Sequence, residues 1–204
     1  MKPVFKPNKS QHPCLAVTMA MLAMAVLLLA GCGSHGGTAN GPTTNQSVSV
    51  SGGGSGATNG IDPEYGHLLH AQPRLPTVKV WLGAEELTTE VAVRPLEVAT
   101  GMMFRTNMLE NEAMLFVFSD VAPRSFYMRN CTVPLTAAYI NPDGVIQEFV
   151  RLDPGDTNGV PSRSWNIQFV LELPQGWHDR HNIRTGAVVR TDRGSLRDTF
   201  FRKN

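Results

Sequence analysis

Cysteine is scarce in this sequence, whose 204 residues include three: Cys14, Cys32 and Cys131. Two of them fall within the first 32 residues, so the rest of the chain holds Cys131 alone. One cysteine cannot form an internal disulfide. A fold that relies on disulfide bridges is therefore excluded for the chain beyond Cys32.

Charged residues are missing from residues 33–60, which contain nine Gly, five Ser, four Thr and three Asn but no Asp, Glu, Lys or Arg. A segment of this composition cannot bury a core, so it predicts a flexible tether. Acidic residues are also missing from the first 31 residues, where the basic ones are Lys2, Lys6 and Lys9. Without these lysines the chain has fifteen basic and seventeen acidic residues, a balance that does not indicate a nucleic-acid partner.

The first 31 residues have the pattern of a bacterial export signal. The three lysines precede a sixteen-residue apolar run from Leu15 to Ala30. This run is shorter than the roughly 20 residues that a membrane-spanning helix needs. It ends in Leu29, Ala30, Gly31 and Cys32, which resemble the lipobox of bacterial lipoproteins. The resemblance implies lipidation of Cys32, so we predict an extracytoplasmic protein anchored to a membrane through this residue.

Beyond residue 76, short apolar runs alternate with turn residues, a texture typical of antiparallel β structure. A continuous apolar run at 114–118 indicates a strand covered on both faces. Asn141-Pro142-Asp143-Gly144 has proline at the second turn position and glycine at the fourth, which predicts a hairpin. Strands are predicted at 78–82, 90–93, 114–118, 137–140, 145–150, 169–173 and 187–189.

Two short helices are expected beside these strands. Pro95 suits a first helical position, and Leu96, Ala99 and Met103 recur on one helix face. Gly101 lies within that segment, which close packing of the backbone would explain. Residues 175–181 form the second, more polar candidate. The chain as a whole is predicted to comprise an export signal (1–31), a lipidated N-terminus and tether (32–60), an irregular lead-in (61–76), a single domain (77–190) and a solvated basic tail (191–204).

The predicted fold class is therefore mainly β, a compact antiparallel sandwich or barrel of about seven or eight short strands with one or two short helices. Four segments of this domain, in order, resemble the uncharacterised bacterial and archaeal family known as domain of unknown function 192. The resemblance implies a jelly-roll-like sandwich and frequent export, but the family has no established activity that could be carried over. The segments are Gly101–Arg105, Met114–Phe118, Ser125–Cys131 with Pro134 and Leu135, and Val170–Leu173 with Gly176.

Three residues depart from the family pattern within or near these segments. Tyr127 stands where the family usually has tryptophan, Cys131 where it has threonine, and Thr136 where it has aspartate. If the family site uses that aspartate, this chain lacks its carboxylate.

The polar residues in the family segments leave two interpretations open. Glu172 interrupts an apolar strand, and a buried charge needs a partner, for which Arg105 and Arg129 are candidates. In the other interpretation, Arg105, Tyr127, Asn130 and Glu172 line a small polar pocket with one aromatic wall. Such a pocket would suit a sugar, another polyol or a small carboxylate.

Sequence patterns for catalysis or metal binding are weak. The chain has no Gly-x-Ser-x-Gly nucleophile motif. His178 and His181 share one face of the second candidate helix, but no firm third ligand accompanies them. We therefore predict no catalytic residue, no metal site and no cofactor.

The sequence favours a non-enzymatic binding or accessory lipoprotein of the cell envelope with a small polar ligand such as a carbohydrate. Two alternatives stay open. One is a hydrolase or isomerase that acts on envelope carbohydrate through carboxylates such as Asp153 and Glu172. The other is a structural component of the envelope.

Replacing Cys32 with serine tests the predicted anchor. Because lipid on Cys32 is the only anchor predicted once the signal is cleaved, we expect Cys32→Ser to leave the membrane fraction. Cell fractionation followed by immunoblotting measures this. A processed Cys32→Ser protein that stays in the membrane pellet would contradict the lipoprotein assignment.

Overall fold

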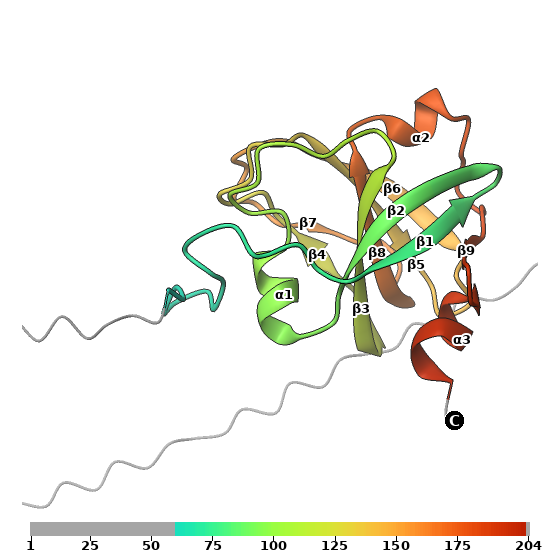
Figure 1. Cartoon of the computed structure of the whole chain (residues 1–204), viewed down its shortest axis with the longest axis horizontal. Helices are drawn as coiled ribbons and strands as arrows, with labels where there is room; N and C mark the ends of the chain where they lie inside the picture. Colours follow the sequence, from blue (N-terminus) through green and yellow to red (C-terminus); the bar gives the residue numbers. More distant parts are fainter. Residues whose placement is uncertain (1–59, 203–204) are drawn as a thin grey trace, which may run out of the picture. The chain divides into compact units, whose positions relative to one another are not determined.

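The computed structural model describes residues 60–202, which form a mainly β domain (Figure 1). This confirms the fold class predicted from the sequence. Three short helices accompany the strands: α1 (Pro95–Thr100), α2 (Trp177–Arg180) and α3 (Leu196–Phe201). The strands are β1 (Thr77–Leu82), β2 (Glu85–Ala92), β3 (Glu112–Ala122), β4 (Ser125–Phe126), β5 (Leu135–Ile140), β6 (Ile146–Leu152), β7 (Val160–Pro161), β8 (Ile167–Pro174), β9 (Val189–Thr191) and β10 (Gly194–Ser195).

Eight strands form one mixed sheet in the order β10-β9-β1-β2-β3-β8-β5-β6, and β4 pairs with β7 in a small second sheet. Every pair is antiparallel except β2 with β3, which run parallel from Thr88 opposite Glu112 to Ala92 opposite Phe116. A parallel pair needs a long crossover. Here the crossover contains α1 and places this helix beside the sheet.

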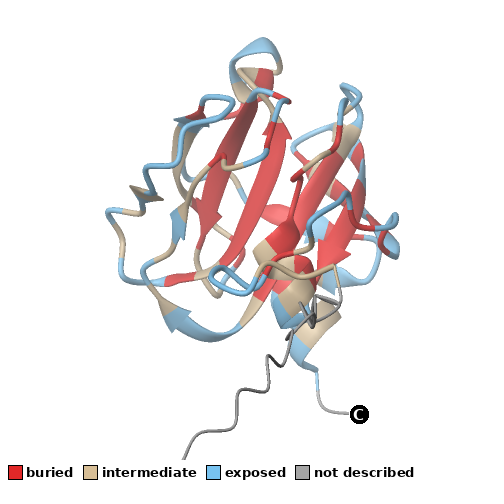
Figure 2. Cartoon of the chain, turned by 90° about the vertical axis from the view of Figure 1, so that its left-hand side faces the viewer, coloured by how far each residue is buried: buried red, intermediate tan, exposed pale blue. Residues whose placement is uncertain are grey.

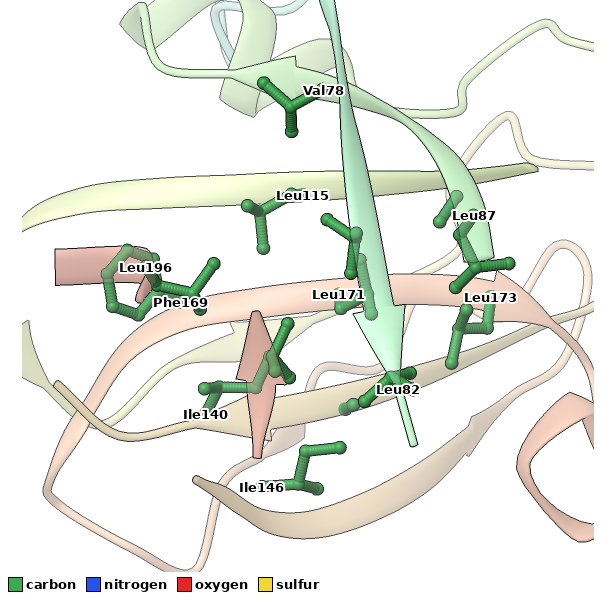
Figure 3. Close-up of a cluster of buried hydrophobic side chains, with 14 of the residues drawn as sticks. Val78, Leu82, Leu87, Leu115, Ile140, Ile146, Phe169, Leu171, Leu173 and Leu196 are labelled. Carbon is green, nitrogen blue, oxygen red and sulfur yellow. The ribbon is translucent and has the colours of Figure 1, made fainter. Parts of the chain in front are cut away.

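Both faces of the central strands are buried, as Figure 2 shows by the red strands in the middle of the domain. Along β8, Phe169, Leu171 and Leu173 belong to one apolar cluster, while Val170 belongs to a second cluster on the other face. Figure 3 shows the first cluster, in which Leu82 of β1 and Ile146 of β6 also take part. The strand predicted to be covered on both faces, within β3, is buried from Ala113 to Val117.

The predicted hairpin joins β5 to β6. The amide of Gly144 donates a hydrogen bond to the Asn141 carbonyl at 3.0 Å, and Gly144 has φ +79°, a conformation that glycine adopts readily. The amide of Val189 donates to the Gly144 carbonyl at 2.8 Å. This bond ties the β5–β6 turn to the first residue of β9, a strand near the other end of the sheet order.

The C-terminal residues are folded, whereas the sequence analysis expected a solvated tail. Ser195 begins α3, and its hydroxyl accepts a hydrogen bond from the Asp198 amide at 3.0 Å. Leu196 is fully buried in the first apolar cluster, and Phe200 packs against that cluster. The expectation was wrong because it rested on the many charged residues of this segment. The segment also contains a capping serine, Ser195, and two apolar residues four apart, Leu196 and Phe200, a spacing that places them on one helix face.

The lead-in before β1 is irregular, as expected, but it packs firmly on α1. Gln72 is buried, and its amide donates hydrogen bonds to the carbonyls of Gly101 at 2.8 Å and Glu97 at 3.2 Å. The Leu68 amide donates to the Thr100 hydroxyl at 3.1 Å.

Residues 60–202 contain both apolar clusters and every pairing of the two sheets. We therefore treat this part of the chain as a self-contained folding unit. The helices found in it are all too short or too polar to cross a membrane. The predicted export signal, Cys32 and the tether lie outside the described residues.

Candidate functional site

Glu172 lies at the centre of the sheet with its side chain buried. It sits on β8 between Met114 of β3 and Ala137 of β5, and it is 4% exposed. Alternation along β8 sends it to the same face as Val170, toward the second apolar cluster. Its Oε2 atom has no hydrogen-bond partner within the described part of the chain. A buried carboxyl without a partner is rare in folded proteins and calls for an explanation.

Burial decides the protonation state of this carboxyl. Loss of solvation raises the pKa of Glu172 to about 8, and no positive charge from the described residues 60–202 offsets this effect. Glu172 is therefore mostly a neutral acid at pH 7. The nearby thiol of Cys131 is protonated too, because burial and then the charge of Glu172 raise its pKa to about 12.

A pocket of about 340 Å³ opens beside Glu172 between α1, β3 and the β4 segment. Figure 1 shows α1 next to these strands. The volume is at the lower end of the roughly 300–1,000 Å³ of ligand sites. Its walls are mainly apolar, and Glu172 is the one carboxylate among the described residues that line it. The lining residues are Val98, Ala99, Thr100, Gly101, Met102, Met103, Phe116, Phe118, Pro123, Arg124, Ser125, Phe126, Tyr127, Cys131 and Glu172.

The Gly101 segment shapes one wall of this pocket. Gly101 ends α1 with φ +48°, where a side chain would be strained. A Cβ atom at this position would come within 3.2 Å of the Phe116 ring. The glycine therefore ends the helix close against β3, which is the close backbone packing expected from the sequence. Met102 and Met103 then follow as buried wall residues.

The pairing of β4 with β7 holds the opposite wall. Phe126 pairs with Val160, and its ring meets Phe116 edge to face with the ring centroids 4.9 Å apart. The backbone of the following loop fixes this segment further, because the Met128 amide donates to the Asp156 carbonyl at 2.6 Å. Pro123 and Ser125 are exposed, so they mark the mouth of the pocket.

Arg105 is buried but pairs with a different acid from the one considered in the sequence analysis. Its guanidinium donates to Glu90, with Nη2 and Oε2 2.9 Å apart. Glu90 also accepts from the Leu75 amide and from Arg74, each at 2.7 Å. Burial alone would raise the pKa of Glu90, but these bonds outweigh it and lower the pKa. The internal ion pair is therefore Arg105–Glu90, and Arg105 does not line the pocket.

Arg129 and Asn130 also lie apart from Glu172. The Arg129 guanidinium stacks over the Tyr65 ring at 4.0 Å. Asn130 is an exposed turn residue with φ +56°, and its carbonyl accepts from the Phe104 amide at 2.8 Å. Of the four predicted site residues, the structure thus brings Tyr127 and Glu172 together in the pocket and places Arg105 and Asn130 elsewhere.

The other polar residues singled out in the sequence lie outside this pocket. Asp153 is exposed and accepts hydrogen bonds from Arg151 at 2.7 Å and Gln175 at 3.2 Å. His178 stacks on Phe149, with the ring centroids 4.1 Å apart. His181 stacks on Trp177 at 4.2 Å and lies within 3.2 Å of a Glu110 carboxylate oxygen.

The apolar walls of the pocket could not be recognised in the sequence. Met102, Met103, Phe116 and Phe126 fall in family segments or predicted core elements, and apolar side chains in a cavity have the same pattern as those in a packed core. The one available signal was their concentration in three of the four family segments.

The fold and the pocket together define a class: a mainly β domain whose central sheet holds a neutral acid at the base of an apolar pocket. The chain belongs to the DUF192 family, described as "Uncharacterized ACR", whose sequence profile matches residues 78–191. Each of the four family segments contributes residues to the lining of the pocket.

Among the solved structures that are similar to this chain, two are informative. A suggested transcription regulator from Sinorhizobium meliloti 1021 is 28% identical, with a TM-score of 0.56, covering 59% of this chain and 98% of its own. A protein of unknown function from Novosphingobium aromaticivorans DSM 12444 is 27% identical, with a TM-score of 0.54, covering 64% of this chain and 90% of its own. Comparison with curated proteins gives no match.

Glu172→Gln tests the neutral carboxyl, because it removes the ionisable proton with little change in shape. The pKa of Glu172 rises on folding from its usual 4.5 to about 8, so the stability that its proton contributes is present below pH 4.5 and is lost as pH rises through 8. Wild type should therefore lose stability between pH 5 and 8, while the variant does not. We expect the difference in free energy of unfolding to change in favour of the variant by up to about 1.4 kcal/mol per pH unit in this range.

Urea denaturation of Gly60–Asn204 at each pH measures this difference. The control is Glu86→Gln, which breaks an exposed ion pair with Lys79 and should cost less than about 1 kcal/mol at every pH. A Glu172→Gln difference that does not change with pH would show that Glu172 is ionised and solvated in the folded protein.

Proposed function

We propose that this chain is an exported, lipid-anchored binding protein whose domain holds a small molecule in the pocket beside Glu172. In this proposal, lipid on Cys32 anchors the protein at the outer face of a membrane, residues 33–60 hold the domain clear of the lipid, and the pocket takes the ligand. The single observation that carries the binding role is a buried carboxyl with an unpartnered oxygen in a preformed cavity of ligand size.

The energetics support a role for Glu172 in binding. An acid whose buried oxygen lacks a hydrogen bond destabilises a fold by about 1 to 3 kcal/mol relative to a satisfied group. Glu90, in the same sheet, has three partners that satisfy its carboxylate. A buried polar group without a hydrogen bond, in a sheet whose other buried carboxylate is hydrogen-bonded, is typical of a functional site.

The pocket walls favour a different ligand from the carbohydrate expected from sequence. A sugar needs a hydrogen-bond partner for most of its hydroxyl groups, since each buried polar group without one is costly. Besides Glu172, the lining has four polar side chains: Thr100, Arg124, Ser125 and Tyr127. The Thr100 hydroxyl already donates to the Leu96 carbonyl and accepts from Leu68, and Arg124 is paired with Asp120. Ser125 is exposed at the mouth, so Tyr127 is the one hydroxyl of this set left to serve a sugar inside the pocket. We therefore propose a ligand with a mainly apolar body.

The hydrolase alternative has less support. Glycosidases of the usual kind act with two carboxyl groups about 5 to 10 Å apart across the substrate. Asp153, the second carboxylate considered, is exposed and does not line the pocket that contains Glu172. A raised pKa would suit a general acid, but the lining offers no base to act with it. Binding without catalysis accounts for the lining more simply.

Filling the pocket from α1 tests the binding role. Ala99 lines the pocket, so Ala99→Phe should occupy ligand space without touching Glu172. Leu96→Phe is the matched control, because Leu96 lies on the same helix outside the lining. Immobilised Gly60–Asn204 is incubated with a small-molecule extract of the cell envelope, washed and denatured, and the released molecules are identified by mass spectrometry.

We expect a small molecule that wild type and Leu96→Phe retain and that Ala99→Phe loses by at least about tenfold, because a phenyl ring and a ligand body cannot share one cavity. Equal retention by all three proteins, or retention by none, would contradict a binding role for this pocket.

A further inference from the structure

We propose that the pocket recognises a small organic ammonium ion, with the charged nitrogen on the Glu172 carboxylate and an apolar body against the aromatic walls. This inference rests on the proposed binding function and names its ligand class. Three features of the site support it. Glu172 is a buried acid with an unpartnered oxygen, aromatic rings line the same pocket, and the Arg124 guanidinium lies over one of these rings, Phe118, at the mouth.

The buried Glu172 carboxyl is best satisfied by a hydrogen-bond donor that carries a positive charge. Glu172 is 4% exposed, and Arg105 and Arg129, the two candidate partners in the sequence, are engaged by Glu90 and Tyr65 instead. An ammonium group brings three N–H donors and a full positive charge, so it satisfies the orphaned Oε2 atom and neutralises the carboxylate together. An anionic ligand would instead place two acids side by side in an apolar site.

The walls suit a cation with an apolar body. Four aromatic side chains line the pocket, and the faces of such rings attract positive charge. Met102, Met103 and Cys131 add polarisable sulfur contacts. The Cys131 thiol stays neutral and so adds no second negative charge. The aromatic lining residues are Phe116, Phe118, Phe126 and Tyr127.

A contact between a cation and an aromatic ring is present at the mouth of the pocket. The Arg124 guanidinium carbon lies 3.9 Å from the centroid of the Phe118 ring, and its Nη2 atom is 2.9 Å from Asp120 Oδ1. Phe118 thus accepts a cation on its ring. Because Asp120 pairs with Arg124, the charge of this arginine is compensated and does not oppose a cation that enters.

Ammonium binding must release a proton near neutral pH. The neutral Glu172 acid loses its proton to solvent, and the resulting carboxylate pairs with the ligand nitrogen, so one proton leaves for each ligand bound. Among the described residues, the titratable groups near Glu172 are the Cys131 thiol, the Tyr139 hydroxyl and the Tyr127 hydroxyl of the lining. Burial raises the pKa of Cys131 and of Tyr139 well above neutrality. Arg124 is the one basic side chain of the lining. Glu172 is therefore the group that titrates.

Three matched probes test the ligand class: 2-phenylethylammonium, 2-phenylethanol and 3-phenylpropanoate. Their binding to Gly60–Asn204 is measured by isothermal titration calorimetry from pH 6 to 8.5, in buffers with different ionisation enthalpies. We expect the ammonium ion to bind most tightly, with an affinity that rises about tenfold per pH unit up to pH 8 and then levels off. About one proton should be released per ligand at pH 7.

Glu172→Gln should lower the affinity for the ammonium probe at least tenfold at pH 8 and abolish its pH dependence. Glu148→Gln is the matched control, since Glu148 is a partly buried carboxylate of β6 outside the pocket, and it should bind as wild type does. The pH profile of wild type with the three probes decides the question even if the Glu172 variant folds poorly.

Tighter binding of the alcohol, with an affinity that falls above pH 8, would mean that the neutral acid donates a hydrogen bond, and it would overturn the ammonium class. Preference for 3-phenylpropanoate would overturn it as well. Both results would leave the binding function standing. Failure of all three probes would overturn the inference, and the pocket-filling variant Ala99→Phe separately decides whether the pocket binds small molecules at all.

Discussion

Burial of both faces of the central sheet is the constraint on which the rest of this domain depends. A strand in the middle of such a sheet has no solvent-facing side, so each residue of β8 from Phe169 to Leu173 must enter one of the two apolar environments. A charged residue on β8 is therefore buried wherever the alternation places it. Its environment then decides whether it is a structural or a functional group.

Glu90 and Glu172 illustrate the two outcomes within one sheet. Three donors surround the Glu90 carboxylate and lower its pKa, which makes this acid part of the ion pairing that holds the lead-in and the Gly101 segment to β2. Glu172 is just as buried but faces a cavity, and its pKa rises. The same residue type in the same sheet thus forms an ion pair at one position and leaves an unpartnered carboxyl oxygen beside a cavity at the other.

The sequence carried enough information for the parts of the fold that local rules control. The Asn141–Gly144 turn, the alternation of β8 and the start of α1 at Pro95 follow from backbone preferences and periodicity, and the structure has all three. The partner of Arg105 could not be predicted, because Glu90 and Glu172 are both acids on buried strands and only the three-dimensional arrangement separates them. The pocket at Tyr127 and Glu172 was predicted, but its apolar walls were missed for a related reason: residues around a cavity and residues in a filled core have the same apolar pattern.

The proposed binding role depends on Glu172 being a neutral acid beside the pocket when no ligand is bound. Carbon-13 NMR of Gly60–Asn204 labelled at the glutamate side-chain carboxyl carbon measures its titration directly, and the Glu172→Gln spectrum assigns the signal. We expect a midpoint near pH 8, since burial without a partner raises this pKa. A midpoint at or below the usual value of 4.5 would mean that the carboxyl is solvated or already paired, and Glu172 would then be ionised at neutral pH.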